Sequence, residues 1–226
     1  PISVTINGVI RTIAANASET FTYTPTPPGG GTTTPSEPEE PALPFTDVAE
    51  GDWFYNAVKY VFERGIMVGT SDTTFEPQSS VTRGQVVQML YNLEGQPTVT
   101  GEDGFTDVQA KDWWYNAVVW ASQNEVVSGY GDGTFQPKRN ISRQEFAQML
   151  YNYAKYKGYD LCVEGDLAQF PDSESVADWA EAAMRWANGN QLINGHDDGT
   201  LEPGGTATRA QAASILMKFD QNLVEN

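Results

Sequence analysis

Apolar and polar positions follow two different periods along the chain. Over residues 1–24 they alternate on both sides of Asn7-Gly8, which predicts short strands joined by a two-residue hairpin turn. Farther along, apolar side chains recur at helical spacing, as at Trp53 and Ala57. The pattern therefore predicts a short β segment at the N-terminus and an otherwise helical protein.

A linker separates the two patterns. Residues 25–44 consist mainly of Pro, Gly, Thr and Glu, a composition typical of an extended linker. A third short strand is predicted at Phe21-Thr22-Tyr23. Because three strands alone are only marginally stable in water, we expect residues 1–24 to be the tail of an upstream β domain. The linker would then hold that upstream cargo apart from the helical part.

The helical part repeats itself three times. Each copy contains a Phe-Thr-Asp-Val-like start, an Asp-Trp pair, a first helix, a loop that leads to a Pro, and a second helix that starts with Ser or Thr followed by Arg. Successive copies start at Phe45, Phe105 and Phe170 and place the tryptophan of the pair at Trp53, Trp113 and Trp179. The predicted repeats are 45–100, 101–165 and 166–226.

Repeats of this length cannot each bury a large core, so we expect residues 45–222 to fold as one unit. An open solenoid would need polar terminal caps, which the sequence does not show, so three copies favour a closed pseudo-threefold domain. Asp52, Asp112 and Asp178 are expected to cap the first helices. The three tryptophans are expected to lie mainly in the core, with ligand contact as the alternative.

Composition excludes several classes of function. The net charge is −17 with only 13 Lys and Arg residues, so nucleic acid is not an expected partner. One Cys and one His cannot form an intrachain disulfide or a zinc site, and we expect Cys162 to be a small buried side chain. No apolar run approaches the roughly 18 residues of a membrane span, so membrane insertion is not expected. A start at Pro1 without a signal segment is expected of a mature fragment of a larger protein.

The second helices start in the same way in every repeat. Ser or Thr at the N-cap and Gln or Glu three positions later fit a capping box, in which each side chain bonds the backbone amide of the other residue. The Gln and Glu residues are Gln85, Glu145 and Gln211. This part of the pattern predicts structure.

Arginine occupies the first position of all three second helices, at Arg83, Arg143 and Arg209. A cation there faces the positive end of the helix dipole and costs about 0.3–1 kcal/mol, so a compensating role is expected. Arginine beside free helix amides could grip a carboxylate or phosphate, which makes these residues candidate anion ligands. The alternative is an internal ion pair with Asp47, Asp107 or Asp172.

The loops between the helices contain two further candidates, Gly133 and Gly199, which are typical of tight turns with positive φ. Repeat one has Thr73 at this position, which is expected to deform its loop. A calcium loop is disfavoured because its ligand spacing and terminal bidentate Glu are absent, so no metal or other cofactor is predicted. The lone His196 is expected to be solvated.

An enzyme is not expected. Carboxylates recur at equivalent positions in all three repeats, whereas a glycosidase needs two carboxyl groups in different environments in one cleft. The sequence also lacks a Gly-x-Ser-x-Gly motif, a phosphate loop and a dinucleotide fingerprint. Recurrence therefore favours binding over catalysis.

Taken together, the repeated motifs over residues 45–222 closely resemble the S-layer homology domains of bacterial surface proteins. The resemblance implies an all-α, pseudo-threefold, three-pronged spindle, in which each repeat gives one helix to a central three-helix bundle and another helix with loops to a prong. It also implies an extracellular location and noncovalent attachment to a secondary cell wall polymer. That polymer is typically a pyruvylated glycan linked to peptidoglycan, bound in grooves between adjacent repeats.

The family's Thr-Arg-Ala-Glu motif falls on the three second-helix starts, with Gln in place of Glu in repeats one and three. Repeat two fits best, and Lys138 and Arg139 add positive charge beside Arg143. In this interpretation the arginines bind the pyruvate carboxylate, and the sugar rings stack on the tryptophans if those rings reach the groove. Two other hypotheses stay open: a protein-interaction or lattice-forming module, and a hydrolase of wall glycan.

Overall fold

The computed structural model describes residues 2–6, 9–13, 43–102 and 104–224, and the chain divides into two units between Ala42 and Leu43. In the first unit, β1 (Ile2–Ile6) pairs antiparallel with β2 (Val9–Ile13). The two strands agree with the predicted hairpin. The turn itself, the rest of the segment to residue 24 and most of the linker over 25–44 lie outside the described residues, so those assignments stay predictions, as do the repeat boundaries.

The second unit contains six α-helices, two in each repeat, and its described residues contain no strand. The helices are α1 (Tyr55–Glu63), α2 (Arg83–Leu93), α3 (Tyr115–Gln123), α4 (Arg143–Lys157), α5 (Glu181–Gly189) and α6 (Arg209–Phe219). Short 3-10 turns η1 (Leu167–Gln169), η2 (Ser173–Ser175) and η3 (Asp178–Ala180) precede α5, and the π-helical turn η4 (Asp220–Val224) follows α6. The predicted all-α class is confirmed.

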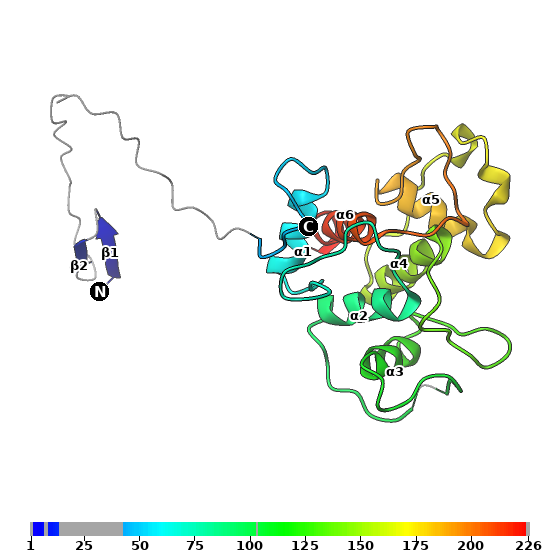
Figure 1. Cartoon of the computed structure of the whole chain (residues 1–226), viewed down its shortest axis with the longest axis horizontal. Coiled ribbons are helices and arrows are strands. Elements are labelled where there is room, and N and C mark those ends of the chain that lie inside the picture. Colours follow the sequence, from blue (N-terminus) through cyan, green and yellow to red (C-terminus); the bar gives the residue numbers. More distant parts are fainter. Residues whose placement is uncertain (1, 7–8, 14–42, 103, 225–226) are drawn as a thin grey trace. The chain divides into compact units, whose positions relative to one another are not determined.

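The second helices α2, α4 and α6 lie in the interior of this unit, and α1, α3 and α5 lie around them (Figure 1). Each outer helix packs against the inner helix of another repeat: α3 against α2, α5 against α4, and α1 against α6. The last of these contacts joins repeat one to repeat three. The helices therefore close into the pseudo-threefold spindle expected from the resemblance, and an open solenoid is excluded.

An ion pair between a buried carboxylate and a partly exposed arginine lies at the contact between α1 and α6. Asp220 directly follows α6 and is fully buried. Its Oδ2 accepts a hydrogen bond of 3.0 Å from the Tyr60 hydroxyl and lies 2.5 Å from Nε of Arg64, at the end of α1. The charged and hydrogen-bonded partners offset the cost of burying this carboxylate. The contact between α1 and α6, which closes the ring of repeats, is thus stabilised by an ion pair and a hydrogen bond.

All three predicted capping boxes are present. The hydroxyl of each N-cap residue accepts from the backbone amide at N3, and the N3 side chain accepts from the N-cap amide. The residues are Thr82 with Gln85, Ser142 with Glu145, and Thr208 with Gln211. Glutamine closes the box as well as glutamate does, as the sequence predicted.

The first helices begin later than the sequence suggested. Phe54 and Trp114 are the N-cap residues of α1 and α3, and neither provides a side-chain cap. The carboxylate of Asp52 instead accepts from the Ala49 amide at 2.8 Å, and Asp112 makes the same bond to Gln109. The prediction of Asp as N-cap was wrong, because these carboxylates close a turn that precedes the helix.

The three tryptophans are exposed, so their assignment to the core was also wrong. Trp53, Trp113 and Trp179 have exposed fractions of 66%, 58% and 56%. Phe54, Trp114 and Ala180, one position farther along, are buried instead. Because the Asp-Trp pair belongs to the preceding turn, helical periodicity does not govern where its tryptophan points.

The connection after α4 gives another correction. Cys162 is exposed, not a buried filler, and its amide donates to Oδ1 of Asp160 at 2.8 Å. The segment runs over the surface between Tyr159 and Asp166, where a small apolar side chain has no core to fill.

Residues 105–165, expressed alone, should not form a stable helical monomer. The inner partner of α3 is α2 and the outer partner of α4 is α5, and both would be absent. Far-UV circular dichroism with sedimentation measures the result, and residues 43–226 should unfold in one transition as the comparison. A cooperative melt of the isolated repeat as a monomer would contradict the closed core.

Candidate functional site

Three pockets of matching construction lie on the helical unit, and every one is lined by all three repeats. One repeat supplies an arginine, another supplies a tryptophan, and the third supplies a loop and one face of its second helix. We name them by the arginine. The Arg83 pocket contains Trp179, α4 and loop 126–130; the Arg143 pocket contains Trp53, α6 and loop 192–196; the Arg209 pocket contains Trp113, α2 and loop 66–70. Their volumes are about 260, 190 and 410 Å³.

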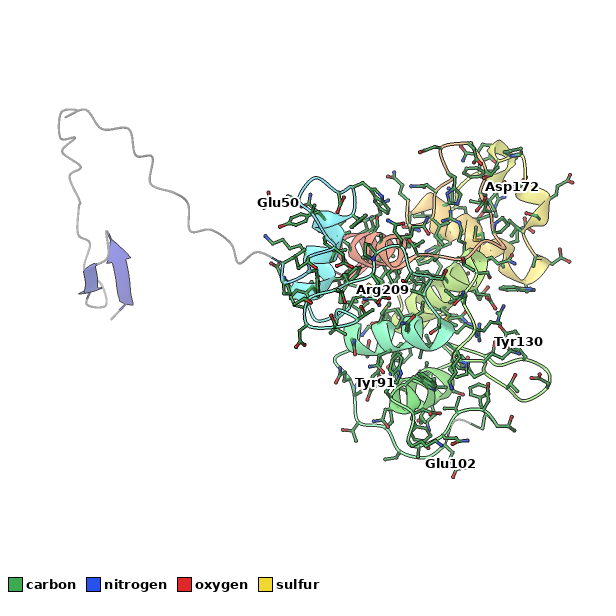
Figure 2. The ribbon with its side chains drawn as sticks, in the orientation of Figure 1. Glu50, Tyr91, Glu102, Tyr130, Asp172 and Arg209 are labelled. Atoms are coloured by element: carbon green, nitrogen blue, oxygen red, sulfur yellow. The ribbon has the colours of Figure 1, made fainter. Side chains whose placement is uncertain are left out.

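Each arginine is 5% exposed and binds backbone carbonyls of the next repeat in the ring. Figure 2 shows Arg209 in the interior of the helical unit. Its Nε donates to the Phe75 carbonyl at 2.6 Å and its Nη2 to the Val68 carbonyl at 2.7 Å. The other two arginines do the same: Arg83 to Phe135 and Ser128, and Arg143 to Leu201 and Asn194. Burial lowers the pKa of all three guanidinium groups, which remain charged.

The helix amides beside the arginines are occupied. The backbone amide of Arg83 donates to the Arg139 carbonyl and that of Gly84 to the Pro137 carbonyl, both at 2.9 Å. Equivalent bonds run from Arg143 and Gln144 to repeat three and from Arg209 and Ala210 to repeat one. The hypothesis of free amides as part of an anion site is therefore wrong, because a neighbouring repeat already satisfies them.

The aspartates act on the same loops from the other side. Asp107 accepts from the amides of Phe135 and Gln136, both at 2.8 Å, while Arg83 holds the carbonyl of Phe135. Asp47 and Asp172 bind the matching amides in repeats one and three. These hydrogen bonds lower the pKa of Asp172. The expected Arg–Asp ion pair is replaced by an indirect link, in which both side chains grip one stretch of backbone.

The family profile described as S-layer homology domain matches residues 44–87, 104–147 and 169–213, more than half of the chain. The chain belongs to the S-layer homology family. It is a cell-surface anchoring module of the extracellular cell wall or S-layer. No helix in the described ranges is both long and apolar enough to cross a membrane.

Curated relatives are much longer proteins. An endoglucanase of Bacillus sp. (strain KSM-635) is 32% identical over 80% of this chain and 19% of its own length. An amylopullulanase of Thermoanaerobacterium thermosulfurigenes is 30% identical over 76% of this chain and 9% of its own length. A surface-layer 125 kDa protein of Lysinibacillus sphaericus is 27% identical over 74% of this chain and 14% of its own length. This S-layer homology chain thus spans about a fifth or less of each of these relatives.

The predicted turn glycines of this S-layer homology chain do not line the pockets. Gly133 and Gly199 have φ of 80° and 83° and lie in tight turns, where Asp132 or Asp198 accepts hydrogen bonds from the following Thr. In repeat one, Ser71 takes this role, and the Thr73 carbonyl still accepts from Thr46 as that of Gly133 does from Thr106. The loop of repeat one keeps its anchoring contact without the glycine. No cluster of metal-ligating side chains occurs among the residues that the structure describes.

Sequence reasoning missed a different set of glycines. Gly69, Gly129 and Gly195 line the three pockets. A Cβ at Gly129 would collide with the Phe105 ring and lie 2.6 Å from the Thr134 carbonyl oxygen. The sequence did contain a signal for these glycines, because every repeat has a glycine 24 or 25 positions after its starting phenylalanine.

The Arg83 pocket carries its own carboxylate. Glu145 lies 3.3 Å from Nη1 of Arg83 and accepts from the Tyr130 hydroxyl at 2.7 Å. Burial alone would raise the pKa of Glu145, but hydrogen bonds from Ser142 and Tyr130 and the charge of Arg83 lower it. Arg139 also pairs with Glu145, so its charge adds to this pocket and not to Arg143 as predicted.

Replacing Arg209 by Ala should lower the free energy of unfolding by about 2–5 kcal/mol, because two charge-assisted hydrogen bonds to buried carbonyls are lost. Urea unfolding measures the change. Arg139→Ala is the matched control: the side chain of Arg139 is 43% exposed and its loss should cost less than about 1 kcal/mol. Equal effects of the two substitutions would show that the carbonyl contacts of Arg209 do not fasten the repeats.

Proposed function

We propose that the chain anchors its protein by binding an anionic secondary cell wall polymer, a pyruvylated glycan associated with peptidoglycan, in these pockets. The observation that carries the proposal is the meeting of a buried arginine and an exposed tryptophan in one pocket, three times over. The arginine would supply positive charge for the carboxylate, and the tryptophan would supply a flat apolar surface for a sugar ring.

The arginines have capacity left for a ligand. A guanidinium carries five N–H donors, and the contacts with the next repeat use Nε and Nη2. Within the described residues, Nη1 of Arg143 and of Arg209 has no hydrogen-bond partner. A pyruvate carboxylate at Nη1 would complete the fork, and the backbone contacts would already hold the group in place.

The tryptophans suit a saccharide. Trp113 lines the Arg209 pocket together with the apolar side chains of Ile66 and Met89. The amide groups of Gln85 and Gln88 belong to the same lining. Apolar ring faces with a few amide groups are the usual environment of a bound sugar-sized ligand. The exposure of Trp113 in the free protein also leaves its ring available for stacking.

Binding and not hydrolysis is proposed for this part of the protein. Glycoside hydrolysis uses two carboxyl groups flanking the scissile bond. Glu145 is the one carboxylate among the lining residues of the three pockets, and Gln85 and Gln211 take its place in the other two. Two relatives are named as glycan hydrolases, but the chain matches only 19% and 9% of their lengths.

Trp53→Ala, Trp113→Ala and Trp179→Ala should each weaken retention on purified, protein-free cell walls by about threefold to tenfold, because a stacking surface is lost. The triple variant should not bind. All should melt near the parent temperature, since the rings are exposed. Sedimentation with walls gives the affinity, and the arginines are unsuitable for this test because they hold the repeats together.

Tyr156→Ala is the matched control, as an exposed aromatic outside the three pockets, and should bind normally. Walls stripped of pyruvate should retain even the parent chain poorly. Undiminished binding to stripped walls would refute the carboxylate. Binding that needs a second protein would support the lattice or protein-interaction alternative, and release of reducing ends from the walls would support hydrolysis.

A further inference from the structure

The three pockets are built alike but differ in charge at matched positions. One such position directly follows the pocket glycine, a second is N3 of the inner helix, and a third lies in the last turns of that helix. For the Arg209, Arg83 and Arg143 pockets in turn, these residues are Thr70, Tyr130 and His196; Gln85, Glu145 and Gln211; and Asn92, Asn152 and Lys218.

The sum of charges therefore separates the pockets. Arg209 is the one charged lining residue of its pocket. In the Arg83 pocket the carboxylate of Glu145 offsets one positive charge, and Arg139 pairs with the same carboxylate beside Arg83. The Arg143 pocket combines Arg143 with Lys218 and His196, and no carboxylate is among its lining residues. It is also the smallest of the three pockets, at about 190 Å³.

His196 is not the solvated side chain that the sequence suggested. Its side chain is 31% exposed, and Nε2 is buried without a hydrogen-bond partner within the described residues. Glu202, the nearest carboxylate, lies 3.6 Å from Nε2, and Asp198 is close enough to feel the charge of the ring. Arg143 on α4 and Lys218 on α6 line the same pocket as His196.

Lys218 is placed to take part. Its ammonium donates to the Gln191 carbonyl at 3.1 Å, which fixes the nitrogen at the edge of the pocket. Two of its three N–H donors then remain for a ligand. In the other repeats the matching asparagines donate to backbone carbonyls of their own loops and carry no charge.

We propose that His196 and Lys218 make the Arg143 pocket the strongest of the three for a carboxylate-bearing saccharide, and that its affinity alone rises as the solution becomes acidic. The inference rests on the proposed function and goes beyond it by ranking the pockets. Histidine changes charge between about pH 5 and 8, whereas the matching Thr70 and Tyr130 do not. Protonation of His196 adds a third cation around the bound carboxylate, so binding tightens as the pH falls.

The test uses residues 43–226 and a small saccharide that bears a ketal-linked pyruvate as the probe, because its carboxylate stays ionised over this pH range. The backbone amides of Gly69, Gly129 and Gly195 report each pocket separately in two-dimensional NMR titrations. At Gly195 the affinity should rise about threefold to tenfold between about pH 7.5 and 5.5. At Gly69 and Gly129 it should change less than about twofold.

Variants taken from the other repeats separate the two contributions. H196T should abolish the pH dependence at Gly195, and K218N should weaken binding there about threefold at both pH values. The reciprocal change, T70H with N92K, should confer pH dependence on Gly69. A dispersed Gly195 signal shows that each variant is folded.

The outcomes distinguish the inference from the proposed function. Suppose that the probe binds, but that its affinity at Gly195 equals that at the other glycines and does not change with pH, with H196T or with K218N. That result would overturn the inference and leave the proposed function standing. If the probe shifted none of the three glycines, both would be wrong. A gain of pH dependence at Gly69 in the reciprocal variant could not arise from altered folding of repeat three.

Discussion

Everything in the helical unit depends on the hydrogen bonds between an arginine and the backbone carbonyls of the next repeat. A buried guanidinium needs acceptors, and a loop with buried carbonyls needs donors. The hydrogen bond from the guanidinium to the carbonyl meets both requirements at once. An aspartate of the receiving repeat accepts from the backbone amides on either side of the same carbonyl. The unfavourable position of a cation at a helix N-terminus is explained by this contact, which outweighs the dipole cost.

The pockets follow from the same contact. Because an arginine must enter the adjacent repeat to reach its carbonyls, its guanidinium arrives at the base of a pocket whose other walls belong to that repeat. The turn before the outer helix of the remaining repeat then adds its tryptophan to the pocket lining. Packing of the repeats therefore also forms the pockets. The arginine that stabilises the contact between two repeats is the same residue that gives the pocket its positive charge.

Much of this could be predicted from local patterns. The three repeats, the capping boxes and the placement of arginine at N1 are visible in the sequence because each depends on residues only a few positions apart. The exposure of Trp53 could not be predicted in this way, because hydrophobic periodicity does not fix the residue at which a helix begins. The partners of the Arg83 amide and guanidinium lie 45 or more residues away, so no local pattern could reveal that the helix amides were already satisfied. The position of His196 in a pocket was missed for the same reason: Arg143 and Lys218, which line that pocket with it, come from elsewhere in the chain.

The sharing of every pocket among three repeats has a consequence for how such a domain evolves. A tandem array usually gains and loses copies by unequal recombination, and each copy keeps its own function. Here the deletion of any one copy removes an arginine from one pocket, a tryptophan from a second and the inner helix from the third. Selection therefore acts on the triplet as the smallest heritable unit, and single copies are free to diverge in sequence only where the other two can tolerate it.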